Sequence, residues 1–157
     1  MATIRDYNVT VSNTIASIRV NDKSKTSYAA LPTLDEINEV MGESVTGETV
    51  SKIELTSCFS GCEALTTAPA IPSGVTSMWA CFNGCISLTT APAIPKGVTR
   101  VGYCFAGCTS LTTAPTIPSS VTDMESCFAS CTALTTAPAI PSRVTDMSYC
   151  FAYCISL

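Results

Sequence analysis

The chain has 157 residues, 46% of them hydrophobic, and its formal net charge at pH 7 is −4. This length and hydrophobic content are enough for the core of one domain. Residues 58–157 carry only three basic and four acidic side chains, which excludes the basic surface that neutralises nucleic-acid phosphates.

Neither a membrane span nor a secretory signal is predicted. No apolar run approaches the roughly 18 residues that cross a bilayer. The opening stretch MATIRDYNVT has neither the basic nor the apolar segment of a signal peptide. We therefore expect no membrane insertion, and either a cytoplasmic location or release by a route that needs no signal peptide, such as assembly into a virion.

Residues 1–50 are predicted to form a small α+β region. The stretch YNVTVSNTIASIRV alternates apolar and polar residues, which predicts one or two strands around a turn at Ser12 and Asn13. In PTLDEINEVMG, a helix is predicted to start at Thr33, with Glu36 three residues later and a glycine as its stop. We expect this region to cap the repeats that follow or to attach them to something larger.

A linker and a half-repeat join this region to the rest of the chain. The stretch GESVTGETVS is predicted to be the linker. Residues 51–57 are predicted to be a half-repeat, because Leu55 stands three residues before Cys58 as Met78 stands before Cys81.

Residues 58–157 repeat one 23-residue unit. Full copies start at Cys58, Cys81, Cys104 and Cys127, and a fifth starts at Cys150 and stops at Leu157. The pattern is CFxxCxxLTTAPxIPxxVTxMxx, with valine once in place of methionine. Such a period is typical of units that stack because none can bury its apolar face alone. The fixed Phe, Leu, Ile and Val columns are therefore predicted to point inward.

The threonine-rich segments and the prolines of the unit predict its local conformation. The Thr-rich LTTA segment and the VTxM segment favour short parallel strands. Between them, the prolines interrupt any hydrogen-bonded ladder. The CFxxC segment is predicted to be one helical turn, with its two cysteines on one face. The predicted fold is a repeat solenoid with one such coil per unit.

The repeats resemble a known family. The stretches LTTAPAIPSGVTSMWACFNGC and VTDMSYCFAYC are similar to the leucine-rich repeat of BspA-like, Treponema-type proteins in period, in the Ile-Pro step, and in the spacing of Phe, Cys and Leu. The resemblance covers residues 58–157 and departs from the family where a cysteine precedes each Phe. It implies a leucine-rich-repeat fold and a role in surface adhesion or recognition rather than catalysis.

Ten cysteines occupy two fixed columns of the repeat, and three explanations for them stay open. They are buried reduced thiols, disulfides between stacked coils, or zinc ligands. The first is favoured, because a chain made without a signal peptide meets a reducing cytoplasm, and CxxxC spacing without any histidine is a poor zinc motif. This predicted cysteine ladder consists of Cys58, Cys62, Cys81, Cys85, Cys104, Cys108, Cys127, Cys131, Cys150 and Cys154.

The columns that vary between copies are the candidates for ligand binding. They hold exposed aromatic residues beside mixed charges, a composition that recognition surfaces use. Drift of unconstrained surface positions explains the same variation equally well. The candidate binding residues are Trp79, Arg100, Tyr103, Asp123, Glu125, Asp146, Tyr149 and Tyr153.

Catalysis is not expected. The chain has no histidine to serve as a general base, and Asp123 and Asp146, one repeat apart, are expected to be solvated carboxylates. No cofactor and no metal are predicted.

The leading functional hypothesis is a non-enzymatic display or adhesion protein that binds a host-surface protein or glycan, for example in a phage head or tail fibre. We expect a homo-oligomer that joins a larger assembly, a virion or a cell surface, through its N-terminal region. The alternatives are a purely structural spacer or filament segment and an intracellular bacterial scaffold. The last unit exposes a raw apolar coil, which truncation, a second subunit or a longer chain would each explain.

Overall fold

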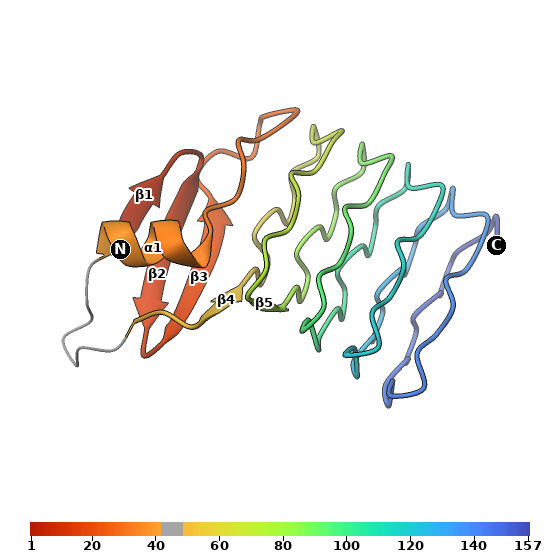
Figure 1. Ribbon diagram of the computed structural model, residues 1–157. Coiled ribbons are helices and arrows are strands. Elements are labelled where there is room, and N and C mark those ends of the chain that lie inside the picture. The colour runs from red at the N-terminus through yellow and green to blue at the C-terminus, as the bar shows by residue number, and fades with distance from the viewer. Residues whose placement is uncertain (42–48) are drawn as a thin grey trace.

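The computed structural model describes residues 1–41 and 49–157. Three strands open the chain: β1 (Ala2–Ile4), β2 (Tyr7–Ser12) and β3 (Ile15–Val20). After them come one helix, α1 (Leu34–Met41), and two short strands, β4 (Lys52–Glu54) and β5 (Val75–Ser77). The coils of the repeats stand in a row, with the N-terminal sheet at one end and the C-terminus at the other (Figure 1).

The sheet has the order β1-β2-β3-β4-β5, and its strand pairing changes from antiparallel to parallel at β3. The pairs β1/β2 and β2/β3 are antiparallel, whereas β3/β4 and β4/β5 are parallel. The predicted strands form a hairpin, but its turn lies at Asn13 and Thr14, one residue later than predicted, because Ser12 still pairs with Ile15. Asn13 has the left-handed φ of 55° that a tight turn needs. One sheet therefore runs without a break from the N-terminal region into the first coils.

Helix α1 begins as predicted. The Thr33 hydroxyl accepts a hydrogen bond of 3.2 Å from the Glu36 amide, and the Glu36 carboxylate accepts one of 2.9 Å from the Thr33 amide. This reciprocal capping box satisfies two donors that the first turn would otherwise leave free. Glu36 also holds both terminal nitrogens of Arg5, at 2.9 and 3.1 Å, which ties the helix to the loop between β1 and β2. The predicted glycine stop at Gly42 and most of the predicted linker lie outside the described residues.

Successive coils are joined by backbone hydrogen bonds at a constant offset. The amides of Leu55, Met78, Val101 and Met124 each donate to the carbonyl 22 residues later. Leu55 therefore occupies the place of Met78 one coil earlier, as its alignment predicts. Beyond β5, strand pairing is reduced to single parallel bridges, which link Ser77, Arg100, Asp123 and Asp146 in turn. The LTTA segment forms one such bridge, between Thr67 and Thr90, rather than the predicted strand.

The CFxxC segment does not form the predicted helical turn. Alternate amides, those of Phe59 and Gly61, donate to the next coil, while those of Cys58 and Cys62 donate to carbonyls three residues earlier. An α-helix needs each amide to bond four residues back, so this alternation replaces it with consecutive tight turns. The left-handed φ angles of Ser57 (56°) and Gly61 (73°), and of their equivalents in later coils, produce the alternation.

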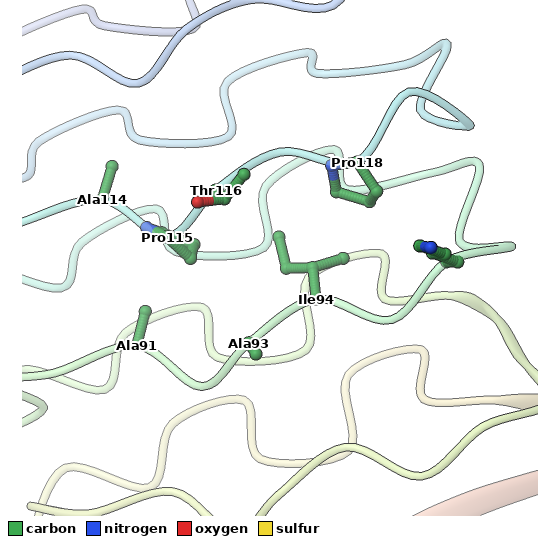
Figure 2. A pocket seen from close by; sticks show the side chains of 8 residues that line it. Ala91, Ala93, Ile94, Ala114, Pro115, Thr116 and Pro118 are labelled. Carbon is green, nitrogen blue, oxygen red and sulfur yellow. The ribbon is translucent and has the colours of Figure 1, made fainter.

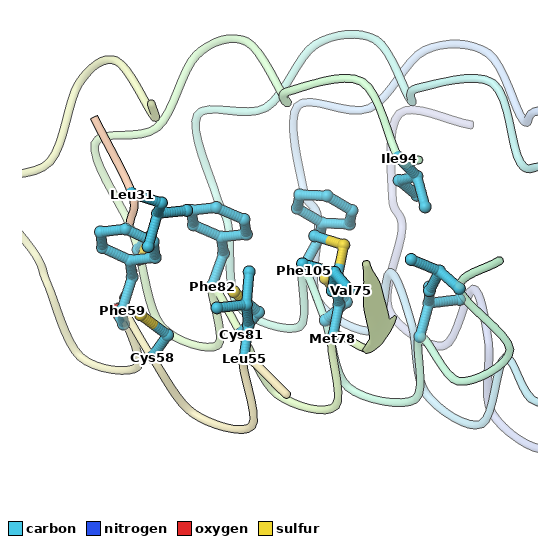
Figure 3. Close-up of a cluster of buried hydrophobic side chains, with 14 of the residues drawn as sticks. Leu31, Leu55, Cys58, Phe59, Val75, Met78, Cys81, Phe82, Ile94 and Phe105 are labelled. Carbon is cyan, nitrogen blue, oxygen red and sulfur yellow. Dashed lines mark hydrogen bonds between the residues drawn. The ribbon is translucent and has the colours of Figure 1, made fainter. Parts of the chain in front are cut away.

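The core is a set of identical side chains stacked one per coil (Figure 3). Phe59, Phe82, Phe105 and Phe128 are completely buried, and their neighbouring rings lie 5.1–5.6 Å apart between centroids. The leucines of the next column are equally buried, which confirms the inward facing predicted for both columns. Burial of this many apolar side chains is the main driving force for folding.

The N-terminal region covers the first ring of this stack. Tyr7 of β2 meets Phe59 edge-on at 6.0 Å, and Tyr28 meets it at 5.3 Å. The Tyr7 hydroxyl donates to the carbonyl of Ala29 at 2.6 Å, so its buried polar group is satisfied. Residues before the repeats thereby extend the same core.

Candidate functional site

The flank formed by residues 77–80 and their equivalents brings five of the candidate binding residues together. Stacking places residues 23 apart side by side, so three coils contribute to one cluster. The Trp79 and Tyr103 rings lie 5.2 Å apart between centroids, tilted by 55°. The guanidinium carbon of Arg100 lies 4.7 Å from the centre of the Trp79 ring, a cation–π distance.

Carboxylates hold this cluster in place. The Nε of Arg100 donates to Asp123 Oδ2 at 3.4 Å, and the Tyr103 hydroxyl donates to Glu125 Oε1 at 3.0 Å. Asp123 Oδ1 in turn accepts the Glu125 amide at 3.1 Å. The Arg100 side chain is 53% exposed, so the ion pair adds little stability. Its effect is to fix the direction of the guanidinium.

Gly102 is a part of this cluster that the sequence did not single out. A Cβ atom at Gly102 would lie 2.2 Å from Cζ3 of Trp79, so the indole rests directly against the glycine backbone. The equivalent positions hold Trp79, Glu125 and Ser148. In this column, a glycine stands one repeat after the only tryptophan of the sequence, and this is the signal that could have identified the packing.

The remaining candidates lie toward the C-terminal coil and do not join the cluster. Asp146 accepts the amide and the hydroxyl of Ser148, at 2.9 and 2.8 Å. The backbone hydrogen bond from Ser148, followed by the hydroxyl bond, lowers the pKa of Asp146. Tyr149 ends the fourth repeat and Tyr153 belongs to the fifth; the two residues are 78% and 80% exposed.

The flank is less exposed than expected. Ser77 and Ser126, in the same variable columns, are buried, and Trp79, Tyr103 and Glu125 are half-buried. Trp79 is packed against Arg100 and Tyr103 of the next coil, and Tyr103 in turn contacts Glu125 of the coil after it. Variation between copies is thus not a reliable sign of full exposure.

All ten cysteines are free thiols in the structure, nine of them buried and Cys154 half-buried. The second cysteine of each later coil donates to the carbonyl of a phenylalanine in the preceding coil, as Cys85 does to Phe59 at 3.1 Å and Cys108 to Phe82 at 3.2 Å. Burial raises the pKa of Cys85 and of Cys131 to about 12. A thiol that stays protonated at neutral pH is a poor nucleophile and a poor metal ligand.

Other site types find little support in residues 1–41 and 49–157. These residues contain no group of three or more His, Cys, Asp or Glu side chains placed to hold a metal ion. Their single helix is too short to cross a bilayer.

A hollow of about 560 Å³ lies on a different part of the coils, between the second and third repeats. Ala91, Ala93 and Ile94 line it from one coil, and Ala114, Pro115, Thr116 and Pro118 line it from the next (Figure 2). Lys96 completes the lining. None of the candidate binding residues contributes to it.

Comparisons with known proteins agree with this architecture. A leucine-rich repeat protein from Bacteroides ovatus matches 99% of this chain with a TM-score of 0.63 and 22% identity, and the match covers 39% of that protein. A leucine-rich cell surface protein from Faecalibacterium prausnitzii matches 82% of the chain with a TM-score of 0.50 and 26% identity, over 38% of its own length. The chain thus spans less than half the length of either protein.

The leucine-rich repeat protein of T. pallidum matches 88% of the chain with a TM-score of 0.50 and 19% identity, over 80% of its own length. A search of curated proteins gives no match. The family described as "BspA type Leucine rich repeat region" matches residues 41–157 in six copies. The chain therefore belongs to the BspA-type leucine-rich repeat family, as the resemblance of its repeats predicts.

Proposed function

We propose that this chain is a non-enzymatic recognition protein, in which a leucine-rich solenoid presents its flank to a protein or glycan on a host surface. The observation that carries the proposal is the cluster of Trp79, Arg100 and Tyr103. Two neighbouring coils place the Trp79 ring 5.2 Å from the Tyr103 ring and 4.7 Å from the Arg100 guanidinium, and two carboxylates of a third coil hold Arg100 and Tyr103. Aromatic residues and arginine supply most of the binding energy at protein interfaces.

The family supports recognition rather than chemistry. One matched structure is described as a leucine-rich cell surface protein, which favours a surface location for this chain. The raised pKa of the buried Cys85 thiol and the absence of histidine from the sequence leave few groups suited to acid–base or nucleophilic catalysis.

The N-terminal region fits a second role within the same proposal. Tyr7 and Tyr28 cover the first ring of the phenylalanine stack, as a cap on a solenoid must. We propose that residues 1–50 cap the solenoid, that residues 51–57 start it, and that an outer surface of the cap attaches homo-oligomers to a cell envelope or a virion.

Binding to an array of extracellular-matrix proteins and soluble glycans tests the flank. The variant Trp79→Ala/Arg100→Ala removes the centre of the cluster. Its matched control is Ile86→Ala/Arg143→Ala, because it removes one exposed apolar side chain and one exposed cationic side chain elsewhere. The proposal expects the first variant to lose binding and the control to keep it, with circular dichroism unchanged in both.

Equal loss in both variants would mean that charge alone drives binding. If the unmodified protein binds nothing on the array, the result favours a structural spacer, in which the coils stack and the flank has no partner.

A further inference from the structure

A second surface of the coils is more uniform than the flank. We call it the threonine face and define it as the TTAPx segments, residues 66–70, 89–93, 112–116 and 135–139. The first four letters are identical in all four copies. No charged residue occurs in the stretches around them, 64–72, 87–95, 110–118 and 133–141.

The identity of the threonines is not explained by the core. Both threonines of every copy are exposed. Some hydroxyls of the first threonine have a structural role, since Thr135 donates to the carbonyl of Thr112 at 3.3 Å. Throughout the described coils, the hydroxyl of the second threonine has no hydrogen-bond partner in the protein. These second threonines are Thr67, Thr90, Thr113 and Thr136.

The threonines are identical in every copy, whereas the residues of the flank differ from copy to copy. At the flank, one column changes from Ser77 to Arg100 to Asp123 between neighbouring coils, so the copies have had room to diverge. An extended conformation favours β-branched residues but does not require a hydroxyl, and an exposed position admits many side chains. An exposed hydroxyl repeated in every copy is therefore available for a partner.

The hollow between the second and third repeats lies on this same face. Its walls are alanine, isoleucine and proline, with Thr116 at one wall and Lys96 as the single charged lining residue (Figure 2). The adjacent segments contribute few backbone bonds to each other here, because proline has no amide to donate. The surface thus offers an apolar hollow beside the exposed threonine hydroxyls.

We propose that the threonine face binds a neutral polysaccharide that runs along the stack of coils. A face with Lys96 as the single charged residue of its hollow offers little to an ionic ligand, whereas alternating hydroxyl and apolar groups suit sugar hydroxyls and the C–H faces of sugar rings. Coils that repeat about every 4.7–4.9 Å present the same groups to successive units of a polymer. This inference uses none of the flank residues, so it stands or falls separately from the proposed function.

Retention on insoluble amorphous cellulose, mannan and starch tests the inference, with polygalacturonate as a charged comparison. The variant Thr90→Val/Thr113→Val removes two free hydroxyls and keeps the shape of both side chains. Its matched control, Thr109→Val/Thr132→Val, removes two hydroxyls from another column, where they donate to backbone carbonyls. Circular dichroism verifies that both variants fold.

We expect the unmodified protein to be retained on at least one neutral polysaccharide, independently of salt concentration. The threonine-face variant should be retained about tenfold less, as expected for two lost hydrogen bonds, while the control keeps its retention. A bulky charge in the hollow, Ala93→Arg, should also abolish it.

Three results would overturn the inference. The first is no retention on any neutral polysaccharide, or equal losses in the two threonine variants. The second is retention that salt abolishes or that is stronger on polygalacturonate, because the ligand would then be ionic. The third is an oligomer, measured by light scattering, that dissociates only in the threonine-face variant, which would assign this face to a second copy of the chain.

Discussion

The rings of Phe82 and Phe105, 23 residues apart in the sequence, lie 5.6 Å apart between centroids with planes only 3° from parallel. Both side chains are completely buried. This stacking is repeated from Phe59 to Phe151. Together with the backbone hydrogen bonds between coils, these contacts keep residues 23 apart side by side, and so place the flank residues next to one another.

Replacing Phe105 by alanine should lower the free energy of unfolding by about 3–5 kcal/mol, since the cavity would open in the middle of a close-packed stack. Urea unfolding measures this change. Tyr149→Ala is the control, because a side chain that is 78% exposed contributes little burial. Similar losses from both substitutions would contradict the assigned facing of the two columns.

Gly102→Ala should displace the Trp79 indole. The new Cβ would lie 2.2 Å from the ring, and overpacking of this kind costs about 1–3 kcal/mol. Trp79 is the only tryptophan of the chain, so its fluorescence reports the displacement directly. The cost should largely disappear in Gly102→Ala/Trp79→Ala. Additive effects of the two substitutions would show that these residues do not touch.

Glu36 should make stability depend on pH in the acid range. The hydrogen bond from Arg5, followed by that from the Thr33 amide, lowers the pKa of Glu36 from 4.5 to about 2. A carboxyl with a lowered pKa in the folded state stabilises the fold above its ordinary pKa and loses that contribution as the pH falls. The Tm difference between the wild type and Glu36→Gln should therefore be constant down to about pH 4.5 and close towards pH 2.

The matched control for this experiment is Glu39→Gln, which changes an exposed residue of the same helix. Its Tm difference from the wild type should not follow the same pH dependence. A Glu36→Gln difference that persists unchanged at pH 2 would mean that the ion pair with Arg5 does not form.

Thiol titration under non-reducing conditions tests the state of the cysteines. We expect almost no reaction in the native protein, because nine thiols are buried and burial raises the pKa of residues such as Cys131 and Cys150, to about 12 and about 11. The half-buried Cys154 should react first. All ten thiols should react after unfolding, and a smaller number would reveal disulfides between coils.

The sequence predicts the parts of this fold that depend on period and on simple capping chemistry. The Phe and Leu columns repeat at a fixed spacing, so their burial follows from stacking alone. The Thr33–Glu36 capping box is equally local. The resemblance of the repeats to BspA-like proteins identified the family that the comparisons then showed.

The tight turns at CFxxC could not be predicted in this way. Their left-handed residues include Ala80, Tyr103 and Ser126, which carry no signal for that conformation, whereas Gly61 and Gly84 do. The contact between Trp79 and Gly102 depends on two coils meeting in one register. Residues from separate repeats form the candidate site, and no single repeat contains it.

Nuclear Overhauser effects between phenylalanine rings test the stacking of the coils, since they report which rings are in contact in solution. In protein labelled only at phenylalanine, we expect an unbroken series of ring-to-ring effects from Phe59 through Phe82, Phe105 and Phe128 to Phe151. Folded protein that lacks the effect between Phe82 and Phe105 would contradict the 23-residue stacking on which the flank and the threonine face both depend.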